Sequence, residues 1–278
     1  MLLATLLALG AAVLHAGWNL VAKRSKSDIY ITLWAQFFMG AVFSLPLMIG
    51  YEIIWGMPWQ GYMWAAVSGC IHLPYVWLLA HAYTVGDFSV SYPVARGGGA
   101  AIAAVCGVVF LRDHLTMLEV VGISVVVCGL VLLAYGATRV HLATALLLAL
   151  AIGLYTTSDA KGARITDSVA YIFASSVGTM TSNTIFALAT GRRREMAAML
   201  RTNWRMNTVT GLASLVTYGM VLVAVRHAPV GYVTALRESS VVLAALAGWK
   251  LLGEGDHRRR LTAAFVVFCG LLTLVLGR

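Results

Sequence analysis

Apolar residues follow one another along the chain in runs of about twenty, separated by short polar interruptions. A helix of this length spans the hydrocarbon core of a bilayer, which is ~30 Å thick. The pattern predicts ten such helices, over residues 2–22, 29–50, 61–83, 88–111, 116–136, 140–160, 167–190, 205–227, 229–252 and 259–277. Among the connections, only residues 190–205 are long enough to hold a further element. We therefore expect an all-α polytopic membrane protein without a soluble domain.

The composition favours the same class. Hydrophobic residues make up 60% of the 278 residues and charged residues 11%, whereas soluble domains carry roughly 25% charged residues. The first apolar run begins at Leu2 without a basic leader, so we interpret it as a retained helix and not as a cleaved signal peptide. The cysteines stand singly in separate apolar runs (Cys70, Cys106, Cys128 and Cys269). This spacing favours neither disulfides nor a metal site, and no cofactor is expected.

The net charge of +9 is unevenly divided between the two sides of the predicted bundle. The odd-numbered connections hold Lys23, Arg24, Lys26, Arg139, Arg192, Arg193, Arg194, Arg201, Arg205, Arg258, Arg259 and Arg260. The opposite side holds Arg112, Lys161, Arg164, Arg226 and Arg278. Cytoplasmic loops accumulate Lys and Arg, so the bias predicts that both termini lie outside. We interpret the basic excess as a topology signal and not as a surface for nucleic acid.

The sequence also matches itself at a constant offset of 141 residues. Residues 125–136, VVVCGLVLLAYG, recur as residues 266–277, VVFCGLLTLVLG, and the same offset pairs Arg96 with Arg237 and Asp113 with Glu254. This predicts two repeats of five helices, residues 1–138 and 139–278. Because five is odd, the second repeat enters the membrane upside down relative to the first. Inverted repeats are typical of secondary transporters, whose substrate site lies near the bilayer midplane between the repeats.

Arg96 and Arg237 lie inside predicted membrane helices, where an arginine costs about 2.5–3.5 kcal/mol. Each is about 10 Å deep, and the two are reached from opposite faces, so we expect both guanidinium groups at one central cavity. There they suit carboxylate or phosphate groups, which accept two parallel hydrogen bonds from the planar guanidinium. The structural alternative for Arg96 is a pair with Glu238 or Asp159. For Arg237 and Glu238 it is a charge pair that holds their helix to the helix of Arg96.

Other polar and aromatic residues within the apolar runs are candidates for lining the cavity. On the first helix, His15, Trp18 and Asn19 share one face at i, i+3 and i+4. Glu238 suits the amine of a zwitterion. The remaining substrate-binding candidates are Tyr75, Tyr92, Tyr155, Asp159 and Tyr232, with Asn183 and Thr234 as further lining residues. Hydrogen bonding between helices is the alternative for this set. Candidates for carrying a coupling proton are Glu238, Asp159 and His72.

Two long segments resemble a known family. AHAYTVGDFSVSYPVARGGGAAIAAVCGVVFLRDHLTMLEVVGISVVVCGLVLL is similar to the first-half signature of the EamA-type proteins in the drug/metabolite transporter superfamily. AVRHAPVGYVTALRESSVVLAALAGWKLLGEGDHRRRLTAAFVVFCGLLTLVL is similar to the second half, and LHAGWNLVAKR resembles the opening of one branch. The resemblance implies a ten-helix basket of two inverted halves that moves small metabolites by alternating access. One departure concerns topology: most members keep their termini inside and carry a basic loop after the second helix, but YEIIWGMPWQG has no Lys or Arg.

We therefore expect a secondary or facilitative transporter of a small anionic or zwitterionic metabolite, amino-acid-like or aminophosphonate-like, in a prokaryotic inner membrane. No GxxxxGK[ST] motif supports ATP drive. One alternative is an exporter of cationic drugs or other toxic metabolites, although paired arginines would repel a cation. A membrane-embedded lipid-modifying enzyme would need a nucleophile–base pair or clustered metal ligands, and the histidines are scattered. The expected partners are a small-molecule substrate and the lipid bilayer, and no enzymatic activity is expected.

Overall fold

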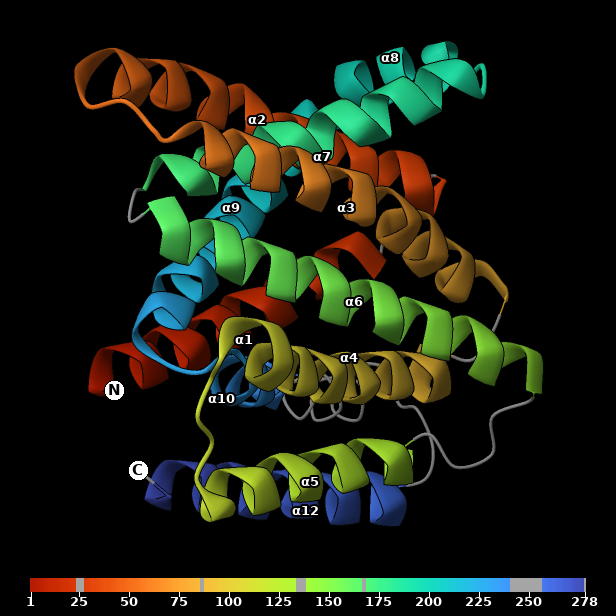
Figure 1. The fold of residues 1–278 in the computed structure, drawn as a ribbon. Coiled ribbons are helices and arrows are strands. Elements are labelled where there is room, and N and C mark those ends of the chain that lie inside the picture. Colours follow the sequence, from red (N-terminus) through yellow and green to blue (C-terminus); the bar gives the residue numbers. More distant parts are fainter. Residues whose placement is uncertain (24–27, 86–87, 134–138, 167–168, 241–256, 278) are drawn as a thin grey trace.

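The computed structural model describes residues 1–23, 28–85, 88–133, 139–166, 169–240 and 257–277, with side chains except those of 18–23, 83–85, 88–94, 133, 139–141, 257–261 and 264. The described part is helical and contains no strand (Figure 1). Its helices are α1 (Leu2–Lys23), α2 (Ile29–Ile54), α3 (Trp59–Val85), α4 (Phe88–Leu111), α5 (Met117–Leu133), α6 (Arg139–Thr166), α7 (Ala170–Ala189), α8 (Arg193–Thr202), α9 (Trp204–His227), α10 (Val230–Arg237) and α12 (His257–Leu276).

The helices lie where the apolar runs predict them, which confirms the all-helical class. The short helix α8 occupies the one connection that was long enough for a further element, and α10 covers the start of the predicted helix 229–252, whose residues 241–252 lie outside the described part. Four helical segments of the described chain are long and apolar enough to cross a membrane: Ile29–Ile54, Trp59–Ala82, Leu142–Thr166 and Trp204–His227. These segments indicate a membrane-embedded protein.

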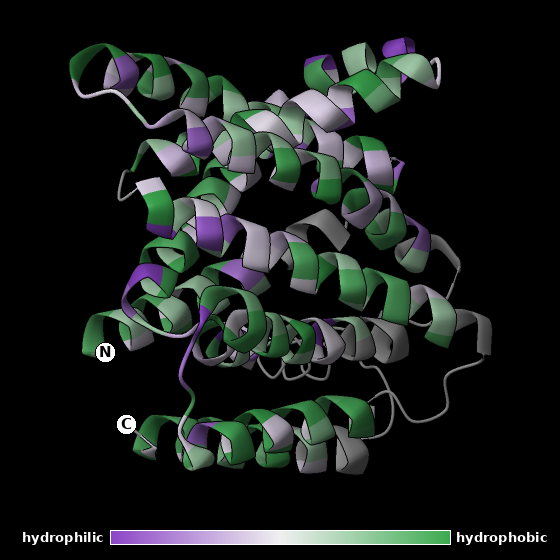
Figure 2. Cartoon of the chain, in the orientation of Figure 1, coloured by the Kyte–Doolittle hydropathy of each residue, from purple (hydrophilic) through white to green (hydrophobic). Residues whose placement is uncertain are grey.

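Large and small apolar side chains are distributed as a lipid environment requires. Phe110 is 67% exposed and Phe268 is 60% exposed, and hydrophobic residues predominate along most of the helices (Figure 2). The interior instead contains many alanines, and Ala4, Ala8 and Ala11 are fully buried. Small residues allow membrane helices to approach closely, while lipid tails cover the bulky ones. An apolar surface of this kind would be poorly soluble in water.

Two helix crossings near the middle of the bundle depend on glycine. Where α3 crosses α7, a Cβ on Gly69 would lie 2.5 Å from the carbonyl oxygen of Gly178, and a Cβ on Gly178 would lie 2.5 Å from that of Ala65. Where α2 crosses α9, a Cβ on Gly211 would lie 2.7 Å from the carbonyl oxygen of Gln36. Gly40 on α2 faces Gly211 at the same crossing. The backbones therefore touch at both places, which only glycine permits.

The antiparallel pair α5 and α12 is built on a third small-residue contact, and it forms the lowest layer in the view of Figure 1. Gly122 of α5 faces Gly270 of α12, and Gly129 of α5 faces Ala263 of α12. A Cβ on Gly270 would lie 2.7 Å from the backbone nitrogen of Val126. This close contact extends along both helices and joins the two ends of the chain's predicted repeats.

The start of α10 is fixed by a carboxylate. Asp113, in the connection after α4, accepts a hydrogen bond from the backbone N–H of Val230 at 2.7 Å. The same carboxylate binds both terminal nitrogens of Arg164 on α6, at 2.7 and 3.3 Å. Arg164 also donates to the carbonyl oxygens of Val225 and Ala228 near the end of α9. The network thus ties together α6, α9 and the start of α10, a helix that carries Arg237.

Candidate functional site: a central cavity

A cavity lies among six of the long helices and α10. Its volume is about 70 Å³, which is room for about five waters or a small solute. Its lining consists of His15, Gln36, Phe37, Gly40, His72, Tyr75, Tyr155, Ile172, Ser175, Ser176, Thr179, Gly211, Ser214, Leu215, Thr217, Tyr218 and Arg237. The glycine crossing of α2 with α9 therefore forms part of the cavity wall.

Arg237, the last residue of α10, lines this cavity and is 3% exposed. Within the described part of the chain, nothing accepts a hydrogen bond from its Nε and no carboxylate forms an ion pair with it. Gln36 on α2 lines the same cavity, is 1% exposed, and has an Nε2 that likewise lacks an acceptor among the described residues. Buried polar groups are nearly always hydrogen-bonded in native proteins. The cavity thus holds two buried donors that can bind an acceptor.

Arg96 has a different environment from Arg237. Its Nε donates to Oε2 of Glu238 at 3.0 Å, and its second terminal nitrogen lies 2.8 Å from Oε1. Both side chains are 2% exposed, and neither is among the described side chains that line the cavity. The geometry is that of the ion pair considered as the structural alternative for Arg96. Its participation in ligand binding stays a prediction.

One wall of the cavity is aromatic, and we call His72, Tyr75, Tyr155 and Tyr218 the aromatic wall. The ring centroids of His72 and Tyr155 are 4.1 Å apart, and those of Tyr75 and Tyr155 are 4.9 Å apart. Tyr218 lies edge-on to His72 at 6.1 Å. Nδ1 of His72 lies 3.0 Å from the carbonyl oxygen of Ser68 and 3.1 Å from the hydroxyl of the same residue, one helical turn earlier.

Behind the aromatic wall lies Asp159 of α6, which is fully buried. Its Oδ1 accepts a hydrogen bond from the hydroxyl of Tyr171 on α7 at 2.7 Å, and its Oδ2 is bonded to the hydroxyl of Tyr218 on α9. The ring of Tyr171 packs against Gly162, one helical turn beyond Asp159. It occupies the space that a Cβ at Gly162 would need. The carboxylate is thereby held between three helices.

The structure brings together some of the sequence-predicted residues and separates others. The predicted residues on the cavity wall are His15, His72, Tyr75, Tyr155 and Arg237. Tyr232 instead shares a hydrogen bond of 2.8 Å with Thr5 of α1, and Thr234 donates to the backbone of its own helix. Asn183 accepts from Tyr30 and donates to Thr179 of its own helix. The side chains of Trp18, Asn19 and Tyr92 lie outside the described residues.

Several lining residues were missed by sequence reasoning. They are a single amide and a set of hydroxyl residues on α2, α7 and α9: Gln36, Ser175, Ser176, Thr179, Ser214 and Thr217. A usable signal existed for α7, because Ser175 and Thr179 are one helical turn apart and share a face. Gln36 has Thr32 one helical turn earlier on the same face, but its direct neighbours in the chain are apolar.

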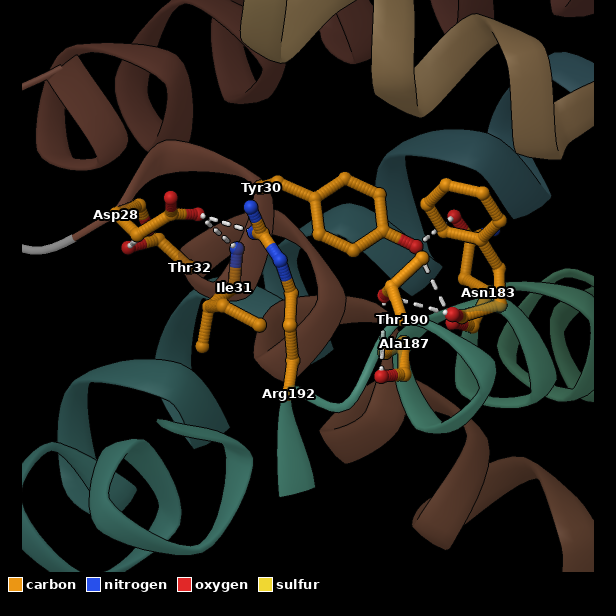
Figure 3. A network of polar contacts seen from close by, with 9 residues as sticks. Asp28, Tyr30, Ile31, Thr32, Asn183, Ala187, Thr190 and Arg192 are labelled. Carbon is orange, nitrogen blue, oxygen red and sulfur yellow. Dashed lines mark hydrogen bonds and ion pairs between the residues drawn. The ribbon is translucent and has the colours of Figure 1, made fainter. Parts of the chain in front are cut away.

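A second polar network joins the start of α2 to the end of α7 (Figure 3). Arg192 binds Asp28 at 3.2 Å and its guanidinium carbon lies 5.5 Å from the ring centroid of Tyr30. The hydroxyl of Tyr30 points to Asn183 and donates to its side-chain oxygen at 3.2 Å. Asp28 also caps α2 by accepting from the N–H of Ile31. By chain direction this network belongs to the opposite end of the bundle from the Asp113–Arg164 network.

Comparisons with known proteins show the fold of the chain, but not its family or its function. Neither a protein-family model nor a curated protein matches the chain. The structure is similar to a solved crystal structure of a protein, with a TM-score of 0.73 over 98% of this chain and 97% of the other. The two sequences are 14% identical, so the similarity shows a shared fold.

Proposed function

We propose that the protein is a secondary or facilitative transporter of the EamA type that binds a small anionic or zwitterionic metabolite in the central cavity. The observation that carries this proposal is the pair of buried donors, Arg237 Nε and Gln36 Nε2, which line one cavity without an acceptor among the described residues. Leaving such groups unsatisfied costs about 1–3 kcal/mol each, and more for a charged group. A ligand that supplies oxygen acceptors recovers this energy.

The chemistry of the two donors favours a carboxylate or a phosphonate. A guanidinium binds such groups through two parallel hydrogen bonds, and charge-assisted bonds are stronger than neutral ones. The amide of Gln36 adds a neutral donor, which suits a second oxygen of the same anion. A cavity of this size suits a small metabolite.

The aromatic wall favours a cationic group at the other end of the ligand. Tyrosine faces attract ammonium groups within about 6 Å of the ring centroid. The buried carboxylate of Asp159 lies behind Tyr218 and adds a negative field on that side. A zwitterion such as an amino acid satisfies both ends of the cavity. A purely cationic drug, the alternative cargo, would gain the aromatic wall but would meet the guanidinium of Arg237, which forms no ion pair with the described carboxylates.

Helix packing supports two inverted halves. The crossing of α3 with α7 uses Gly69 and Gly178, and the crossing of α2 with α9 uses Gly40 and Gly211. These pairs correspond in the proposed repeat, since Gly211 follows Gly69 by 142 residues and Gly178 follows Gly40 by 138. Gly129 and Gly270 of the α5–α12 contact are separated by the full offset of 141. Both chain ends also lie on one side of the bundle in Figure 1, as an even number of crossings requires.

Alternating access needs contacts that close each end of the cavity in turn. The two polar networks are suited to this, since Asp113–Arg164 ties α6 to α9 and α10, and Arg192–Asp28 ties α7 to α2. We propose that they open alternately during transport. The Lys/Arg bias of the connections further supports a prokaryotic inner-membrane location with both termini outside.

The direct test uses purified protein reconstituted in proteoliposomes. Amino acids, aminophosphonates, polyamines and cationic dyes are screened by thermal shift, and uptake of a ¹⁴C-labelled mixture of common amino acids is then measured. We expect zwitterions or anions to stabilise the wild type and Arg237→Gln to abolish that stabilisation. Arg201→Gln on the exposed face of α8 is the matched control and should behave as wild type. Stabilisation by cationic dyes alone, or an unchanged response of Arg237→Gln, would contradict the proposal.

A further inference from the structure

Asp159 is a buried carboxylate whose partners are unusual for a charge inside a membrane bundle. Among the described residues, no Lys, Arg or His lies within ion-pair distance of it, and its hydrogen bonds come from the neutral hydroxyls of Tyr171 and Tyr218. Glu238, the other buried carboxylate considered for proton transfer, is neutralised by Arg96. Both carboxylates lie in the bundle interior, but only Asp159 lacks a compensating cation in the described structure.

We propose that Asp159 is the proton-binding site of the transport cycle and that Tyr218 connects it with the cavity. The inference rests on the proposed transport function. Tyr218 supplies the connection because its ring lines the cavity while its hydroxyl bonds to the carboxylate. Tyr171 bonds to the same carboxylate from α7 but is not among the described lining side chains.

The three helices that meet at Asp159 provide a physical reason for linking its protonation to conformation. Burial disfavours a charged carboxylate, and hydrogen bonds donated to it favour the charged form. Here one donor stands on α7 and the other on α9, while the acceptor stands on α6. A relative movement of these helices that withdraws either hydroxyl leaves the charge uncompensated, and the carboxylate then takes up a proton. Protonation in turn favours the conformation in which the hydroxyls have moved away.

The proton path is short and balanced. Tyr218 passes its hydroxyl proton to Oδ2 of Asp159 and accepts a replacement proton from solvent in the cavity. One O–H bond breaks at the hydronium ion that donates from the cavity, one breaks and one forms at Tyr218, and one forms at Asp159. The net result is the transfer of one proton from the cavity to the carboxyl group.

The other ionisable groups around Asp159 leave this assignment intact. On the packed helices they are His72 of α3, Tyr171 of α7 and Tyr218 of α9, while α10 contributes Arg237 to the cavity. The helix α4 meets α6 through Gly98, Gly99 and Ile102. On α6 itself the neighbours are Tyr155, Lys161, which is half-buried, and Arg164, which is bound by Asp113.

A spectroscopic test does not require a known substrate. In infrared difference spectra of the purified protein between acidic and neutral pH, we expect a carboxylic-acid C=O band that Asp159→Asn lacks. Tyr171→Phe and Tyr218→Phe each remove one donor to the charged form, so each should raise the midpoint of this band by about one pH unit. These conservative variants remain informative if Asp159→Asn fails to fold. An identical band in wild type and Asp159→Asn, or unshifted midpoints in a folded pair of tyrosine variants, overturns the inference.

A transport test separates the inference from the function on which it rests. Proteoliposomes are loaded with the ¹⁴C-labelled amino-acid mixture and assayed for exchange at equal pH and for accumulation driven by a pH gradient. Asp159→Asn should lose the response to the gradient, and Tyr218→Phe should slow that response at least tenfold while Tyr171→Phe retains it. If Asp159→Asn still responds to the gradient, proton binding is assigned wrongly but transport stands. If the wild type shows no exchange, the proposed function fails, and the infrared band still decides whether Asp159 binds a proton.

Discussion

Arg96 binds the carboxylate of Glu238 through two nitrogens, at 3.0 and 2.8 Å, and both side chains are 2% exposed. The pair joins α4 to the residue that follows α10. Arg237, one position earlier in the chain than Glu238, has no such partner in the described structure and lines the cavity instead. Arg237 and Glu238 are adjacent in the chain but face different surroundings. Arg96 and Arg237, which the predicted repeat makes equivalent, therefore have different environments.

Removing Arg96 should destabilise the protein strongly. Arg96→Gln leaves the charge of Glu238 buried without its partner, which costs about 3–5 kcal/mol. The double variant Arg96→Gln/Glu238→Gln removes both charges and should recover most of this loss. Denaturation of the purified protein in mild detergent by added sodium dodecyl sulfate measures the free energy of unfolding. A double variant as unstable as the single one would contradict the ion-pair assignment.

Arg237→Gln should affect stability much less than Arg96→Gln. The guanidinium of Arg237 forms no ion pair among the described residues, so its removal leaves no carboxylate uncompensated. We expect a change within about 1 kcal/mol of wild type in the same denaturation experiment. A loss as large as that of Arg96→Gln would show that Arg237 has a structural partner and would weaken the ligand assignment.

The glycine residues at the two helix crossings allow a test of the close backbone contacts there. A methyl group at Gly178 would lie 2.5 Å from the carbonyl oxygen of Ala65, and one at Gly211 would lie 2.7 Å from that of Gln36. These atoms belong to the backbone, so Gly178→Ala and Gly211→Ala should each cost about 1–3 kcal/mol. Gly50→Ala is the matched control on α2, because nothing lies within 4 Å of its Cβ position. It should leave stability unchanged or raise it by up to about 1 kcal/mol, since alanine favours helix.

The two polar networks should differ in strength. Asp113 is largely buried and binds Arg164 and the N–H of Val230, so Asp113→Asn should cost about 1–3 kcal/mol. Asp28 and Arg192 are considerably more exposed, and exposed ion pairs contribute about 0–1 kcal/mol. Asn also caps helices well, so Asp28→Asn should stay within about 1 kcal/mol of wild type. Equal losses in the two variants, measured by denaturant titration, would contradict this ranking.

The direction of insertion is open to a simple measurement. The Lys/Arg bias predicts that the C terminus lies outside. A C-terminal fusion to alkaline phosphatase, which is active only outside the inner membrane, should therefore be active in cells. A fusion to green fluorescent protein, which fluoresces when folded in the cytoplasm, should be dark. The reverse result would place the termini inside and overturn the topology prediction.

The sequence predicted the helices well because insertion into lipid depends on composition averaged over about twenty residues. It predicted the site less completely, since contacts between helices depend on crossing positions that spacing along one helix does not encode. Glu238 was one of two alternative partners for Arg96, and only the approach of α4 to α10 decides between them. Gln36 has a single polar neighbour at helical spacing, Thr32, which does not by itself mark a cavity-lining face. The pairing of Gly40 with Gly211 becomes visible only when α2 and α9 are known to cross.

The placement of alanine and glycine at the helix contacts, with many bulky apolar side chains on the outer face, reverses the rule of tolerance known from soluble proteins. Exchanging one bulky apolar residue for another on the outer face alters only contacts with fluid lipid chains. Adding a single methyl group inside displaces a neighbouring helix. A saturation mutagenesis map of this chain should therefore show its most permissive apolar positions among the largest side chains and its strictest among the smallest.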